Sequence, residues 1–167
     1  KEWRITQVQF EAWAGEAVVM RWNERAREVA RKVMALPNPK MGFNSYAFDD
    51  PILVRSGVPI EGPRHDLMYA WHHLQPDLPR GLQFVTSFYQ PMFEPWKHLS
   101  NLAEWYGGCD VDGPLYIGEQ VFTQLEQRGI LNGYERHVRE LFPVYEAQAK
   151  RGVPMDRPRL KELGGVL

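Results

Sequence analysis

Apolar and polar residues alternate near the start of the chain, in two short stretches on either side of a glycine. The second stretch covers residues 17–20, and the first contains Ile5, Val8, Phe10 and Trp13. A period of two is typical of a β-strand with one buried face. Because Gly15 lies between the two stretches and glycine tolerates tight turns, we expect a β-hairpin.

A helical period follows the hairpin. Apolar residues recur three and four positions apart from Ala26 to Met34, with charged residues on the opposite side. Asn23 stands just before this stretch and is a favoured N-cap residue. Pro37 and Pro39 follow it and predict its end. Residues 41–43 then predict a short strand.

The pair Asp50-Pro51 predicts the start of a second helix, with aspartate as N-cap and proline at the first helical position. Asp49 then lies at the junction of a strand and a helix, where side chains commonly face the active site of an α/β protein. Only one of the two acids can cap this helix. We therefore expect Asp50 to cap it and Asp49 to face a site.

The rest of the chain predicts helices separated by turns. Short helices are expected at about residues 66–74, with Asp66 as N-cap, and around residues 84–88. A longer helical region follows Pro95. Within it Pro114 would remove a hydrogen bond and clash with the carbonyl of Asp110, so we expect a kink or break there.

A last long helix is expected to begin at Gly133. Its apolar stripe consists of Tyr134, Val138, Leu141, Phe142 and Tyr145.

Composition indicates a globular protein. The 167 residues, 44% of them hydrophobic, fit one domain with its own core. No apolar run approaches the roughly 20 residues that span a bilayer, so we expect no membrane partner. The single cysteine cannot form an internal disulfide and fits a reducing compartment. Since the chain begins at Lys1 and its first methionine is Met20, we expect a piece of a longer product.

Two segments contain residues suited to hydrolysis of a phosphodiester. Asn44-Ser45-Tyr46-Ala47-Phe48-Asp49 ends in a carboxylate, and Tyr106-Gly107-Gly108-Cys109-Asp110 supplies a second one with a tyrosine four residues before it. Residues i and i+4 share a helix face, so this tyrosine and this aspartate should face one site. Two-metal hydrolysis needs clustered carboxylates and a polar group that orients water. The net charge of −1 gives no general attraction to nucleic acid.

Together with two further segments, these motifs resemble the 3′→5′ proofreading exonuclease domain of bacterial and bacteriophage family A DNA polymerases. Residues 42–53 resemble the second motif of that family, and residues 106–110 resemble its third motif in the tyrosine form. Residues 66–68 with 79–82 resemble a helix pair of the family. Residues 141–156 resemble its bridge to the polymerase domain.

The resemblance implies a ribonuclease H-like α/β fold over residues 1–150, with a mixed sheet flanked by helices. Residues 151–167 would lead toward a polymerase domain, and Leu160, Leu163 and Leu167 would be exposed without it. The implied cofactor is Mg²⁺ or Mn²⁺, the substrate is the 3′ end of single-stranded DNA, and the setting is the cytoplasm of a bacterial or phage-infected cell.

The resemblance also implies roles for five residues. Asp49 and Asp110 would hold the metals, and Tyr106 would orient the attacking water. Asn44 and Phe48 would contact the substrate. Each residue has a structural alternative: a helix cap for Asp49, a solvated helix charge for Asp110, packing for the two aromatic residues, and a bond to nearby backbone for the asparagine.

The first motif of the family, an Asp-x-Glu on the opening strand, does not occur before Asn44. Residues 3–6 resemble the second strand, so we expect the first strand upstream of Lys1. Gln9-Phe10-Glu11 is the nearest acidic segment, but it lies one strand late. The alternative is a motif that has decayed, leaving a catalytically inactive structural or DNA-binding module. Either way, little exonuclease activity is expected from this chain alone.

Two other segments of the sequence suggest metal sites of a different kind. His65-Asp66 with His72 and His73 suggests a His-Asp phosphohydrolase, but that architecture needs a histidine before His65, which is the first in the chain. His72 and His73 are also adjacent and face different sides of a helix. The segment 110–113 resembles a calcium loop but lacks its regular spacing and closing glutamate. Trp96-Lys97 and His98 could touch a phosphate backbone, although tryptophan after proline also suits packing.

Overall fold

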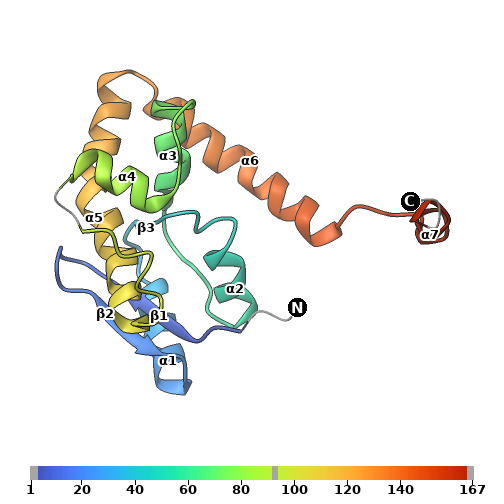
Figure 1. The fold of residues 1–167 in the computed structure, drawn as a ribbon, viewed down its shortest axis with the longest axis horizontal. Helices are drawn as coiled ribbons and strands as arrows, with labels where there is room; N and C mark the ends of the chain where they lie inside the picture. Colours follow the sequence, from blue (N-terminus) through green and yellow to red (C-terminus); the bar gives the residue numbers. More distant parts are fainter. Residues whose placement is uncertain (1–3, 92–93, 165–167) are drawn as a thin grey trace. The chain divides into compact units, whose positions relative to one another are not determined.

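The computed structural model describes residues 4–91 and 94–164, so Lys1, Trp3 and Leu167 lie outside the described residues. The chain divides into two units, Lys1–Tyr134 and Glu135–Leu167. The first unit mixes helices and short strands, as expected for the α/β class (Figure 1). Its elements are β1 (Gln7–Phe10), β2 (Val18–Arg21), α1 (Glu24–Met34), β3 (Lys40–Gly42), α2 (Asp49–Arg55), β4 (Arg64–Asp66), α3 (Leu67–Leu74), α4 (Leu82–Tyr89) and α5 (Ala103–Gln127).

The predicted hairpin and first helix are confirmed. β1 and β2 pair antiparallel from Gln7 opposite Arg21 to Phe10 opposite Val18. Gly15 lies in their turn with φ 81°, a left-handed conformation that glycine adopts without strain. At the start of α1, the Asn23 side chain accepts the Ala26 N–H at 2.9 Å.

The strands form two small sheets rather than the one central sheet that was expected. β1 and β2 form one, and β3 pairs with β4 in parallel to form the other within the described residues. The strand β3 was predicted, but β4 was not. The segment Arg64-His65-Asp66 has no apolar alternation, so its sequence does not predict a strand. It forms a strand because it pairs with β3.

The prediction that Asp50 caps α2 is wrong. The helix begins at Asp49, two residues before the expected first position at Pro51, and its cap residue Phe48 makes no side-chain capping bond. Asp50 is buried, and its carboxylate pairs with Arg64 Nη1 at 3.0 Å. The arginine on β4 therefore takes the carboxylate that would have capped the helix. Pro51 fits the first turn, where backbone N–H groups have no helical acceptor.

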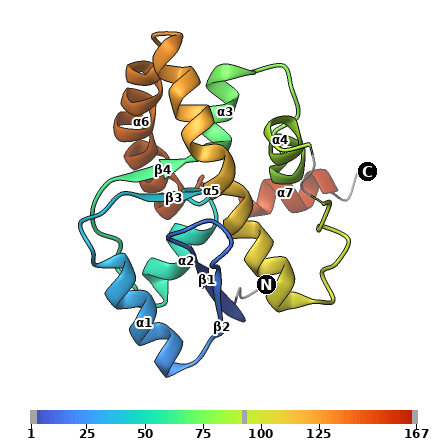
Figure 2. The same cartoon turned by 90° about the vertical axis from the view of Figure 1, so that its left-hand side faces the viewer.

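Of the kink or break expected near Pro114, the break is absent, since α5 is one helix of 25 residues. Figure 2 shows it beside α3 and α4, and it also contacts both sheets. Its glycines permit these close approaches: a Cβ on Gly107 would lie 2.5 Å from Gln7 Nε2, and one on Gly113 would lie 3.1 Å from Thr86 Oγ1. Tertiary packing thus outweighs the low helix propensity of glycine and proline.

The second unit holds most of α6 (Leu131–Arg151) and all of α7 (Arg157–Gly164). The boundary expected after residue 150 falls inside this unit. Every described side chain of α7 is exposed, including Leu160 and Leu163, each at about half of its maximal exposure. No helix of the described ranges, α5 and α6 included, is long and apolar enough to cross a membrane.

We expect deletion of residues 157–167 to change the free energy of unfolding by less than about 1 kcal/mol, because the described part of this segment buries no side chain. Urea denaturation of the full and shortened chains measures the difference. A loss of several kcal/mol would show that the tail belongs to the core of this chain and would contradict its assignment as a bridge.

Candidate functional site

The loop between β3 and α2 holds the first candidate residues. Asn44 adopts φ 60°, a left-handed conformation that asparagine tolerates better than most residues. Its backbone N–H donates to Asp66 Oδ1 at 2.9 Å, and the Tyr46 N–H donates to Asp66 Oδ2 at 3.2 Å. Asp66 therefore fixes the path of the Asn44–Asp49 motif.

Asp66 is the residue that sequence reasoning missed as part of the site. The expected capping bond exists, with Met68 N donating to Oδ1 at 3.0 Å, but the carboxylate also accepts the two bonds from the loop. The residue is fully buried. Burial raises its pKa to about 6, although its backbone hydrogen bonds act in the opposite direction. Its role could not be predicted because Asp66 is the last residue of β4, a strand that the sequence pattern did not predict.

Asp49 and Phe48 lie at the surface end of this loop, and both are exposed. The pKa of Asp49 is nevertheless raised to about 6, first because neighbouring protein excludes water from one side of it and then because of the charges of Asp50 and Asp66. The charge of Asp110 contributes as well. Carboxylates from the start of α2, from β4 and from α5 therefore contribute to the pKa of Asp49.

Tyr106 and Asp110 meet at one lysine. The ammonium of Lys97 donates to Asp110 Oδ1 at 2.5 Å and to the Tyr106 hydroxyl at 3.0 Å. The indole of Trp96 donates to the same Oδ1 at 2.7 Å. The spacing of four residues thus brings the tyrosine and the aspartate to the same cation, as a shared helix face predicts.

The Trp96-Lys97 segment comes from the connection between α4 and α5. Trp96 is buried at 1% exposure, which agrees with the packing role expected for a tryptophan that follows a proline. Partial burial alone would lower the pKa of Lys97, but its bonds to Asp110 and Tyr106 outweigh this effect and raise it. The sequence suggested Lys97 only as a phosphate contact. Its partner in this structure is the candidate metal ligand.

Comparison with protein families, curated proteins and solved structures found no match to this chain.

As they lie, these residues do not fit a two-metal centre. Within residues 4–91 and 94–164, no group of three or more histidine, cysteine, aspartate or glutamate side chains is placed to hold a metal ion. The Oδ1 oxygen of Asp110 already accepts hydrogen bonds from an ammonium and an indole. A Mg²⁺ or Mn²⁺ ion bound to Asp110 would place a second positive charge beside this ammonium, which is unfavourable.

The remaining candidates contact other groups. His65 packs against Phe122 with ring centroids 5.1 Å apart, and the Nδ1 atom of His73 lies 2.7 Å from the Tyr69 carbonyl oxygen. Both imidazoles are therefore engaged in packing or backbone contacts. The tyrosine, Tyr69, belongs to α3, the same helix as His73.

Glu11, from the acidic segment nearest to a first motif, pairs with Asp112. Its pKa is raised to about 7 by partial burial, by a hydrogen bond to the Asp112 carboxyl and by that residue's charge. Asp112 Oδ1 accepts the Gly15 N–H at 2.8 Å, which fastens the hairpin turn to α5. Since Asp112 follows Asp110 by two positions, the two side chains point to different sides of α5.

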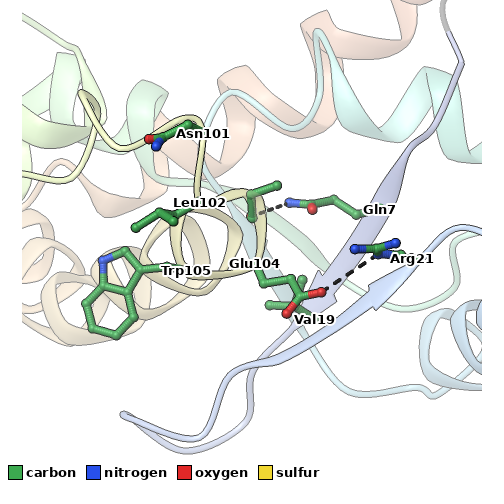
Figure 3. Close-up of a pocket in the computed structure, with 8 residues that line it drawn as sticks. Gln7, Val19, Arg21, Asn101, Leu102, Glu104 and Trp105 are labelled. Atoms are coloured by element: carbon green, nitrogen blue, oxygen red, sulfur yellow. Dashed lines mark hydrogen bonds and ion pairs between the residues drawn. The ribbon is translucent and has the colours of Figure 1, made fainter.

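A separate open pocket of about 530 Å³ lies between the hairpin and the start of α5 (Figure 3). In it Gln7 Nε2 donates to the Ala103 carbonyl at 3.0 Å, and Arg21 lies 3.8 Å from Glu104. None of the five candidate residues is among the described residues that line this pocket. The lining consists of Gln7, Val19, Arg21, Asn101, Leu102, Ala103, Glu104 and Trp105.

Proposed function

We propose that this chain is a 3′→5′ exonuclease-type domain of a family A DNA polymerase, of ribonuclease H-like fold, that receives the 3′ end of single-stranded DNA and does not hydrolyse it unaided. The observation that supports this proposal is that Tyr106 and Asp110 meet at the ammonium of Lys97, and the charge of Asp110 also makes a small contribution to the raised pKa of Asp49. Two motifs that the resemblance selected, more than fifty residues apart in the sequence, contribute carboxylates to one neighbourhood.

Several features suit a DNA end. Phe48 is 45% exposed beside Asp49, and exposed aromatic rings are the side chains on which the bases of single-stranded DNA stack. Asn44 lies in the same loop, which Asp66 holds in place. The residues contributed by this chain could orient the terminal nucleotide. They do not supply the full set of acids that metal-assisted hydrolysis requires.

A second candidate function is a structural module of a polymerase with no nuclease activity. The contact between Lys97 and Asp110 favours it, because the ammonium neutralises the carboxylate that hydrolysis would need. The two candidates differ in whether the DNA end binds at the Phe48 loop.

We expect the chain to bind a short single-stranded DNA but not to shorten it in the presence of Mn²⁺. The Phe48→Ala variant should bind at least about fivefold more weakly, since loss of one base–aromatic stack costs about 1–3 kcal/mol. Trp13→Ala removes another exposed aromatic ring, on the hairpin turn, and should bind like the unmodified chain. Fluorescence anisotropy and gel analysis of DNA labelled at its 5′ end give both results.

Absence of DNA binding, or equal binding by the Phe48→Ala and Trp13→Ala variants, would reject the exonuclease-type assignment in favour of the structural module. Stepwise shortening that Asp110→Ala abolishes would show instead that this chain supplies every carboxylate needed for hydrolysis, and would reject its proposed inactivity.

A further inference from the structure

The environment of Lys97 differs from that of an ordinary surface ion pair. Its ammonium lies 4.5 Å from the ring centroid of Tyr106 and 5.5 Å from that of Trp96, besides its bonds to Asp110 and the Tyr106 hydroxyl. About a third of the side chain is exposed. Two aromatic rings and two hydrogen-bond acceptors therefore surround one positive charge.

Other carboxylates act on the same acidic neighbourhood as Asp110, whose charge contributes to the raised pKa of Asp49. Asp49, Asp50 and Asp66 surround the start of α2, and the pKa of Asp49 is raised partly by the neighbouring carboxylates. Arg64 neutralises Asp50 from β4. Lys97 neutralises Asp110 in the same manner, so the acidic neighbourhood has two cations supplied by the chain itself.

A divalent cation bound to Asp110 would lie beside the Lys97 ammonium. The ammonium lies 2.5 Å from Asp110 Oδ1, a charge-assisted hydrogen bond. Mg²⁺ and Mn²⁺ prefer carboxylate oxygens as ligands, so the ion and the ammonium compete for the negative charge of one carboxylate. The rings of Trp96 and Tyr106 stabilise the Lys97 ammonium further and so favour the lysine over the metal ion.

We propose that Lys97 is the resident cation of this site, occupying Asp110 in place of a divalent metal ion and limiting the affinity of the site for such an ion. The proposal builds on the proposed function in treating Asp110 as the metal-facing acid. Lys97 acts as a positioning residue, through the carboxylate that it holds.

The test is the affinity of the chain for Mn²⁺, measured without DNA by electron paramagnetic resonance of the free ion. We expect Lys97→Met to bind Mn²⁺ at least about tenfold more tightly than Lys32→Met. The latter variant also removes one positive charge, from an exposed pair with Glu28. Lys97→Arg, which keeps the charge, should bind Mn²⁺ as weakly as the unmodified chain. Combining Lys97→Met with Asp110→Asn should abolish the gain.

Equal Mn²⁺ affinity of Lys97→Met and Lys32→Met would overturn the proposal, as would a gain that persists when Asp110 is replaced. Circular dichroism checks folding, and Lys97→Gln provides a second uncharged side chain if methionine disturbs the packing. The outcome is separable from the proposed function: tighter Mn²⁺ binding without any DNA binding supports the lysine and rejects the exonuclease-type domain. DNA binding at Phe48 without an Mn²⁺ gain does the reverse.

Discussion

Replacement of Asp66 by alanine is expected to lower the free energy of unfolding by about 3 kcal/mol or more. The carboxylate is fully buried and accepts backbone N–H groups from Asn44, Tyr46 and Met68. Its removal leaves these donors without their acceptor, at a cost of about 1–3 kcal/mol for each buried unsatisfied group. Urea denaturation followed by circular dichroism measures the loss.

Asp66→Asn keeps one acceptor oxygen and should lose about half as much stability, because its amide nitrogen cannot accept the remaining N–H groups. Asp77→Ala is the matched control. Asp77 is exposed, so its replacement should change stability by no more than about 0.5 kcal/mol. Similar losses for Asp66→Ala and Asp77→Ala would mean that the buried carboxylate does not hold the loop.

The Gly62→Ala variant is expected to lose about 2–3 kcal/mol of stability. Gly62 has φ 77°, and a Cβ there would lie 2.7 Å from the carbonyl oxygen of Pro37 and 3.0 Å from that of Asn38. Both clashing atoms belong to the backbone and cannot rotate away, so the strain of the left-handed conformation adds to a steric cost. Thermal and urea denaturation of the variant give the loss.

Gly81→Ala is the control for this substitution. Gly81 has φ −74°, and a Cβ there would meet nothing within 4 Å, so alanine should be neutral or slightly stabilising through its effect on the unfolded chain. If both alanine variants were equally stable, the turn before β4 would have to be looser than the structure shows.

Sequence patterns predicted the elements that are stabilised by contacts between residues close in the sequence. The hairpin follows from alternation around Gly15, and α1 follows from its apolar period and the Asn23 cap. Both depend on residues close in the sequence. The same reasoning placed Tyr106 and Asp110 on a common helix face, and both residues contact one lysine.

The errors arose where distant residues decide the outcome. Asp50 did not cap its helix because Arg64, fourteen residues later, takes its carboxylate. The strand β4 forms through pairing with β3, and α5 continues through Pro114 because its glycines fit against Gln7 and Thr86. Propensity is a weak guide when such tertiary contacts compete with it. Lys97 was missed as a partner of Asp110 for the same reason, since their contact depends on the path of the connection into α5.

The bonds from Asp66 also affect how fast the Asn44–Asp49 loop can move. Most surface loops open on timescales of nanoseconds to microseconds, because solvent replaces their contacts easily. Here the amide groups of Asn44 and Tyr46 are held by a carboxylate with no solvent exposure. Releasing them exposes part of the core around β4 and α3, so the loop opens together with a larger cooperative unit. We therefore expect slow amide exchange at these two positions and a single conformation of the loop before any partner binds.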